Sequence, residues 1–100
     1  MKKKEIFKVK LPNIDFMMEL TKEFLDGKID GVTYSLDFEY HIEKRYKKMH
    51  KEDDDYCDLI YEDLYEDGVS RFNELSDEEF EKLIRKQYNY IKKIAKEGFY

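Results

Sequence analysis

The chain has 100 residues, enough for one small domain but not for a second core. Of these residues, 43% are charged, 41% are hydrophobic and 16% are aromatic, so the chain is too apolar for a disordered tail. One Pro and four Gly argue against a turn-rich β-sandwich or barrel. We expect a folded, soluble, acidic domain whose small interior disfavours an elaborate enzyme.

The single cysteine, Cys57, has no partner for an internal disulfide, so the sequence implies no oxidising compartment. Its basic start, Lys2–Lys4, is not followed by the apolar stretch of a secretion signal. No run approaches the roughly 20 apolar residues that a membrane span requires. We therefore expect a cytoplasmic protein with no membrane partner.

The formal net charge of −5 is unevenly distributed along the chain. Residues 52–81 hold 14 acids and one base, Arg71, whereas the other 70 residues carry a balance of +8. Residues 52–67 alone contain nine acids and no base. A helix usually mixes in lysines, because like charges four residues apart repel by roughly 0.2–0.5 kcal/mol per pair. The dense block predicts attraction to a basic partner, although most charge runs are simply solvated helix faces.

Residues 1–12 are expected to form an extended arm ahead of a helical bundle domain at 13–100. Residues 5–11 alternate loosely between polar and apolar side chains and precede Pro12, a pattern typical of extended chain. The pattern fits both a short strand and a loose tether.

Two helices are expected in the first half of the domain. The first has Asn13 as its N-cap and ends at Gly27 in the C′ position. The second follows Asp30 as N-cap, and it is ambiguous because its apolar residues fit both a strand and a helix. The strand pattern is Val32, Tyr34, Leu36, Phe38, Tyr40 and Ile42, and the helical stripe is Tyr34, Phe38, Ile42, Tyr46 and Met49. A helix is preferred, because it also accounts for residues 43–49, where the alternation has stopped.

The sequence pattern in the second half of the domain predicts two more helices. One runs from about Tyr56 to Phe72 and is interrupted near Gly68. The other begins with a capping box, in which Ser76 and Glu79 each satisfy a backbone N–H at the helix start. Its core-facing stripe is Phe80, Leu83, Ile84, Gln87, Tyr88, Ile91, Ile94 and Ala95, and its outer bases are Lys82, Arg85, Lys86, Lys92, Lys93 and Lys96. Four helices with short connections predict an all-α fold, a compact antiparallel four-helix bundle.

Little in the sequence points to catalysis, so we expect no enzyme, no cofactor and no metal. His41 and His50 are not helical neighbours, and Cys57 lies on an apolar face, where an inert buried thiol is the common state. Asp53–Asp55 lack the ligand spacing, the central Gly and the final Glu of a calcium loop. Three Arg and a net negative charge disfavour nucleic-acid binding.

Protein recognition remains, and the acidic helix is the candidate surface. With its apolar stripe of Cys57, Ile60, Tyr61 and Leu64 buried, a helical wheel turns the other side of the helix outward. Asp55, Glu62 and Glu66 then point away from the core, and Leu59 lies among them as an apolar anchor ringed by charge. The candidate partner-binding residues are Asp54, Asp55, Tyr56, Asp58, Leu59, Glu62, Asp63, Tyr65 and Glu66. In the alternative interpretation the helix is buried on two sides and Leu59 is a core residue.

Several motifs of the chain suggest a family. Phe24-Leu25-Asp26-Gly27-Lys28-Ile29 is followed by Tyr34-Ser35 and by Glu43-Lys44-Arg45-Tyr46. These motifs resemble the first half of the colicin D immunity protein-like family, with its Phe-Leu, small-residue, Lys-Ile turn, its aromatic-Ser pair and its charged helix end. The stretch from Leu59 through Phe72 looks like the third helix of that family, and Ser76 through Lys93 is similar to its last.

The resemblance covers about residues 16–95, and the chain departs from the family in its arm, 1–12, and its denser acids at 52–55. It implies a small helical bundle that neutralises the nuclease domain of a bacteriocin or contact-dependent inhibition toxin, typically a tRNA-cleaving one. It also implies that the acidic surface covers the toxin's basic RNA-binding cleft in place of the substrate phosphates.

We therefore expect a cytoplasmic immunity protein that binds a cognate basic nuclease toxin domain and is a monomer or weak dimer when free. Two alternatives stay open. One is an acidic nucleic-acid mimic that inhibits a host or phage nucleic-acid-binding protein. The other is a small enzyme or metal module built on Asp53–Asp55, Cys57 and His50.

Overall fold

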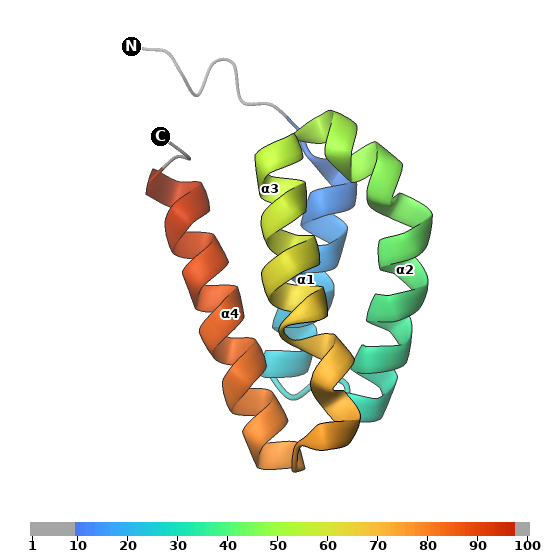
Figure 1. Ribbon diagram of the computed structural model, residues 1–100, viewed down its shortest axis with the longest axis vertical. Helices are drawn as coiled ribbons and strands as arrows, with labels where there is room; N and C mark the ends of the chain where they lie inside the picture. Colours follow the sequence, from blue (N-terminus) through green and yellow to red (C-terminus); the bar gives the residue numbers. More distant parts are fainter. Residues whose placement is uncertain (1–9, 98–100) are drawn as a thin grey trace.

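The computed structural model describes residues 10–97 as six helical elements. In chain order they are α1 (Pro12–Leu25), α2 (Gly31–Glu52), α3 (Asp54–Leu59), the π-helix η2 (Ile60–Glu66), the 3-10 helix η3 (Val69–Glu74) and α4 (Asp77–Glu97). Because η2 continues directly from α3, the chain forms four main rods that alternate in direction (Figure 1). The predicted all-α bundle is confirmed, and the described part contains no strand.

The N-terminal arm is only partly covered by the structure. Residues 1–9 lie outside the described residues, and Lys10 and Leu11 are not helical. Pro12 is the first residue of α1, so the helix begins inside the range expected for the arm.

Helix α2 settles the ambiguity between helix and strand. Its helical stripe faces the core, where Tyr34, Phe38, Ile42 and Met49 are buried. The residues that only the strand pattern would have buried are Val32, Leu36 and Tyr40, and these are 55%, 63% and 58% exposed. The helical period therefore determines which side chains reach the core.

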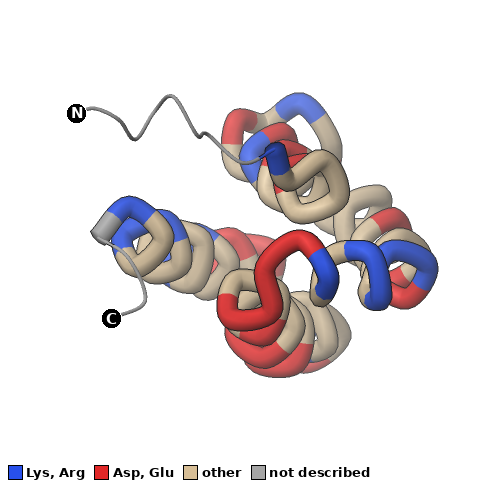
Figure 2. The backbone as a smooth tube through the Cα atoms, turned by 90° about the horizontal axis from the view of Figure 1, so that it is seen from above, with Lys and Arg blue, Asp and Glu red and all other residues tan. Residues whose placement is uncertain are grey.

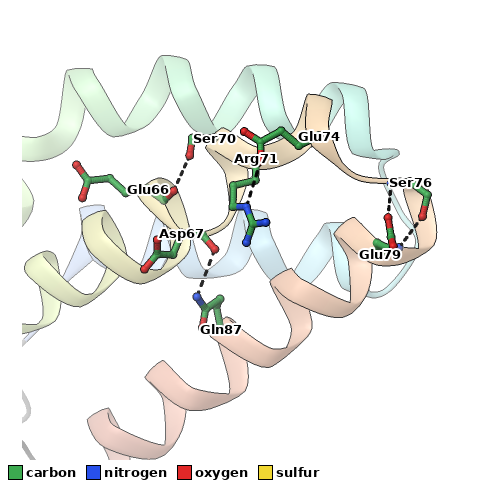
Figure 3. Close-up of polar contacts among 8 residues, drawn as sticks. All are labelled: Glu66, Asp67, Ser70, Arg71, Glu74, Ser76, Glu79 and Gln87. Atoms are coloured by element: carbon green, nitrogen blue, oxygen red, sulfur yellow. Dashed lines mark hydrogen bonds and ion pairs between the residues drawn. The ribbon is translucent and has the colours of Figure 1, made fainter.

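Three of the predicted helix ends are confirmed. The Asp30 carboxylate accepts a hydrogen bond from the Thr33 N–H at 2.8 Å, which caps α2. Gly27 follows the last turn of α1 with a φ of 81°, in the left-handed region that favours glycine. At the start of α4, the Ser76 N–H donates to Glu79 at 3.0 Å and the Glu79 N–H donates to the Ser76 Oγ at 3.1 Å (Figure 3).

The predicted N-cap of α1 is wrong, because Asn13 lies inside the helix. Leu11 occupies the N-cap position, and its side chain has no hydrogen-bonding group to offer the open N–H donors. The carboxylate of Glu52, at the far end of α2, takes that role. It accepts hydrogen bonds from the Asn13 N–H at 2.9 Å, the Asn13 Nδ2 at 2.6 Å and the Ile14 N–H at 2.9 Å.

The charge of Glu52 is favoured at this position. Partial burial raises the pKa of its carboxyl, but the hydrogen bonds from Ile14 and Asn13 and the nearby Arg45 outweigh burial, so the pKa falls below its ordinary value of 4.5. Arg45 also donates to the Asn13 Oδ1 at 2.7 Å. The N-terminal end of α1 is thus held by the C-terminal end of α2.

The third predicted helix is more divided than expected. It begins at Asp54, changes to π geometry at Ile60 and ends at Glu66, and the Asp67 N–H bonds the Glu62 carbonyl five residues back. The predicted interruption near Gly68 is confirmed. The chain then turns through η3, where the Ser70 hydroxyl bonds the Glu66 carbonyl and Gln87 of α4 bonds the Asp67 carbonyl (Figure 3).

Aromatic rings fill the end of the core nearest the α1–α2 turn. The Tyr34 ring stacks on Phe24 with centroids 4.7 Å apart, and Phe80 lies 5.5 Å from Phe24 and 5.0 Å from Phe72. The buried Tyr34 hydroxyl pairs with the Thr21 hydroxyl at 2.8 Å, so neither polar group is left unsatisfied.

The predicted faces of α4 are confirmed. Phe80, Ile84 and Ile91 are buried and the other stripe residues are half-buried, while the six predicted outer bases are all exposed. Two of these bases form ion pairs with acids one turn earlier, Lys82 with Glu78 and Arg85 with Glu81.

Replacing Glu52 should weaken the fold. Glu52→Ala leaves the first N–H donors of α1 without their carboxylate, and we expect a loss of about 1–2 kcal/mol in the free energy of unfolding at pH 7, measured by urea denaturation. Glu19→Ala, at an exposed site in the middle of α1, is the control. Because the folded-state pKa of Glu52 lies below 4.5, its contribution is present above that pH and is lost as the pH falls further. If the difference in the free energy of unfolding between wild type and Glu52→Ala stayed the same from pH 7 to pH 3, this role of Glu52 would be contradicted.

Gly68 should not tolerate a side chain. A Cβ at this position would collide with the Leu64 carbonyl oxygen and lie 3.0 Å from the Ile84 side chain, and a backbone carbonyl cannot yield as a side chain can. We expect Gly68→Ala to cost about 1–3 kcal/mol in the free energy of unfolding. Asn73→Ala, at an exposed position of η3, serves as the control. Equal stability of the two variants would show that the turn relaxes freely.

Candidate functional site

The predicted partner-binding residues all lie on one rod, α3 with η2, here called the acidic rod (Asp54–Glu66). Asp54, Asp55, Glu62 and Glu66 are exposed, and Tyr56, Asp58, Leu59, Asp63 and Tyr65 are half-buried. The predicted buried stripe is confirmed for Cys57, Ile60 and Leu64, whereas Tyr61 is half-buried. The outward positions of the three carboxylates taken from the helical wheel, at 55, 62 and 66, are also confirmed.

The predicted outward position of Leu59 is wrong in part. Its side chain is half-buried and packs against the core, because the acidic rod contacts both α2 and α4. The alternative of a rod covered on two sides therefore describes Leu59 better than an isolated exposed anchor does.

The two tyrosines among the predicted partner-binding residues, Tyr56 and Tyr65, lie in different surroundings. Tyr56 lines a cleft together with Met18 of α1 and Tyr88 of α4. Tyr65 lies against α2, where its ring stacks on Phe38 with centroids 6.0 Å apart. The structure therefore does not bring Tyr56 and Tyr65 together at one binding face.

A row of aromatic rings follows the boundary between α2 and the acidic rod. Tyr65 contacts Tyr61 with centroids 5.4 Å apart, Tyr61 contacts Tyr46 at 5.2 Å, and Tyr46 lies 5.8 Å from His50. Tyr61 and Tyr65 belong to the π-helix η2. Because they are four residues apart, they lie on one side of the rod, and both pack against α2.

Carboxylates from both elements border these rings. The Tyr65 hydroxyl donates to the Glu39 Oε2 of α2 at 3.3 Å. Burial, the charge and hydrogen bond of Glu39, and the charge of Glu43 raise the pKa of Tyr65. Burial raises the pKa of Tyr46, and Cys57, Asp58, Tyr61 and Glu62 add to the shift in that order. We call this group the acidic seam: Glu39, Glu43, Asp58 and Glu62, with Tyr46, Tyr61 and Tyr65.

Sequence reasoning missed Glu39 and Glu43 because it sought the site on one helix. They are four residues apart on α2, beside the edge of the stripe that carries Tyr46, and that spacing was the available signal.

The carboxylates of the acidic seam have no cationic partner within residues 10–97. The ion pairs of this part of the chain join Lys22 to Asp26 and Arg71 to Glu74, or lie within α4. Figure 2 shows the acids following the acidic rod, with Lys and Arg gathered at the C-terminal ends of α2 and α4. Burial and the charge of Asp67 raise the pKa of Asp63, as expected where carboxylates crowd.

Some acids of the dense block serve the fold instead. Glu52 caps α1, and the Asp53 carboxylate accepts the Tyr56 N–H at 3.1 Å at the start of α3. The exposed carboxylates of Asp54 and Asp55 lie in the first turn of α3, where negative charge complements the helix dipole.

The residues considered for metal binding do not gather into a metal site in the described part of the chain. Cys57 is buried, and its Sγ contacts the Tyr46 carbonyl oxygen at 3.8 Å. Between residues 10 and 97, His, Cys, Asp and Glu nowhere gather in a group of three that could hold a metal ion. None of the described helices combines the length and the apolar character needed to cross a membrane.

Comparison with family models, with characterised proteins and with solved structures finds no match to this chain. What the protein does must therefore be inferred from its own residues.

The Cys57 thiol should be nearly inert in the folded protein. Burial, with the charges of Asp58, Glu52, Asp53 and Asp54, raises its pKa to about 11, and the thiolate is the reactive form. Relative to the ordinary value of 9.0, we expect at least about 100-fold slower alkylation at pH 8 than in the urea-unfolded chain. Labelling of the native protein at the rate of the unfolded chain would restore Cys57 as a candidate nucleophile.

Proposed function

We propose that the protein is an immunity protein, a non-enzymatic inhibitor that binds a cognate basic nuclease toxin domain one to one. The observation that carries the proposal is the acidic seam, in which four carboxylates border tyrosine rings and none is paired with a cation of the described chain. Carboxylates without a cationic partner, beside half-buried aromatic rings, are well suited to a surface of arginine and lysine.

The seam offers two kinds of contact to such a surface. A carboxylate can take two parallel hydrogen bonds from one guanidinium, much as a phosphate does. A tyrosine ring can take a cation over its face, a contact worth about 0.5–1 kcal/mol at an exposed site. A nuclease cleft built to bind the RNA backbone presents many such cations, so the acidic seam would occupy it in place of the substrate phosphates.

The exposed acids of the rod extend the seam at both ends. Asp54 and Asp55 lie at the start of α3 and Glu66 at the end of η2, so the negative surface runs the length of the acidic rod. This field would steer a basic domain toward the rod and speed its association. Tyr56 lies apart from the seam, and Leu59 would contribute only the part of its side chain that stays exposed.

The family resemblance supports the proposal through the fold. The Phe24–Ile29 motif forms the end of α1 and the following turn, with Gly27 at its positive φ, and the Tyr34-Ser35 and Glu43–Tyr46 motifs lie within α2. These are mainly positions that build the first two helices, whereas the seam supplies the surface for the partner.

Charge reversal on the acidic rod should slow association with the toxin. With Glu62→Lys and Glu66→Lys together, we expect the rate of association with the cognate nuclease domain to fall roughly 10-fold or more at low salt. The dependence of the rate on ionic strength should largely disappear. Stopped-flow mixing with an inactive variant of the nuclease domain measures both quantities.

Glu19→Lys with Glu23→Lys is the matched control, since it makes the same charge change at the same spacing on α1. Both double variants should unfold at the wild-type temperature. An equal fall in association rate for the two double variants would show that net charge alone, and not the position of the carboxylates, controls association. If the wild type fails to bind the nuclease domain and instead captures a host nucleic-acid-binding protein, the alternative function, an acidic nucleic-acid mimic, would be favoured.

A further inference from the structure

A groove lies between the N-terminal half of α2 and η3. Val32 and Leu36 of α2 form one wall, Phe72 and Ser70 of η3 lie on the other, and the volume is about 290 Å³. Gly31 lets the Phe72 ring approach α2, because a Cβ there would stand only 3.1 Å from that ring. The groove is thus built by close packing of the two elements.

The walls of this groove include apolar surface that the fold leaves uncovered. Leu36 is 63% exposed and Val32 is 55% exposed, one turn apart on the same side of α2. A volume near the lower end of the roughly 300–1,000 Å³ seen for ligand pockets suits one or two amino-acid side chains. Apolar side chains that enter such pockets at interfaces often contribute most of the binding energy.

Glu39 connects the groove to the acidic seam. Among residues 10–97 it is the one charged residue that lines the groove, and its carboxylate also accepts a hydrogen bond from the Tyr65 hydroxyl of the seam. A segment whose apolar side chain enters the groove would therefore place its neighbouring residues beside Glu39, Glu43 and Tyr65. The charge there selects for arginine or lysine and against acidic segments.

We infer that the groove receives an apolar side chain of the same basic toxin domain that the acidic seam binds, carried next to an arginine or lysine that pairs with Glu39. The inference rests on the proposed function and assigns separate roles to the acidic seam and the groove. The carboxylates attract and orient the domain, and the groove holds it once bound. Burial of Leu36 and Val32 would act on dissociation, because apolar contact exerts no force at a distance.

Leu36→Ser, alone and together with Val32→Ser, tests this inference. We expect dissociation of the inactive nuclease domain, followed by surface plasmon resonance, to become roughly 10-fold faster for the single variant, with an association rate within about twofold of wild type. Tyr90→Ser is the matched control, since Tyr90 is a 48% exposed aromatic residue on α4. Because Leu36 and Val32 are mostly exposed, thermal unfolding should stay close to wild type for all three.

The outcomes separate the groove from the proposed function. If only the groove variants dissociate faster and the Glu62 and Glu66 reversals slow association, both the groove and the proposed function are supported. Wild-type dissociation for Leu36→Ser with Val32→Ser, while the charge reversals still slow association, overturns the groove and leaves the immunity function standing. Absence of any binding by the wild-type protein overturns both. A slower association rate for Leu36→Ser would also overturn the groove as a holding site.

Discussion

The acidic rod must bury one side while it keeps a dense negative charge on the other. Cys57, Ile60 and Leu64 anchor it in the core, and the carboxylates between them repel one another along its outer edge. Like charges on one helix face lower the stability of that helix, so the rod depends on tertiary packing against α2 and α4. Ile60 and Leu64 are buried in the core, while Tyr61 and Tyr65, each one residue further along the chain, pack against α2.

That constraint explains why the site is shared between two elements. A single helix could present carboxylates, but tyrosine rings half-buried between helices also fix where those carboxylates lie. Tyr65 bonds Glu39 of α2, and Tyr46 of α2 lies against Tyr61 of η2. The negative surface is therefore supported by packed aromatic side chains, so the proposed partner would meet carboxylates that the fold already holds in part.

Much of this fold could be predicted from local patterns, because each helix carries its own period and its own caps. Asp30, Ser76 and Gly27 act within a few residues of their own helix ends, and the α4 stripe repeats over about four turns. The predictions that failed depend instead on contacts between residues that are far apart in the sequence. Glu52 caps a helix 38 residues away, and Glu39 of α2 accepts a hydrogen bond from Tyr65 of η2. The spacing of Glu39 and Glu43 is a local signal on α2, but it does not identify Tyr65 as their neighbour. The pattern therefore located the acidic rod and missed the α2 half of the seam.

The carboxylate of Glu52 has an effect beyond the end that it caps. The α1–α2 hairpin is joined by the chain at residues 26–30, and at its open end Glu52 bonds Asn13 and Ile14. Two helices fastened at both ends form a closed frame whose members cannot splay or slide independently. Val32, Leu36, Glu39 and Glu43 all belong to that frame. A partner that docks along α2 would therefore meet a rigid edge, and any adjustment would fall to the shorter α3, η2 and η3 beside it.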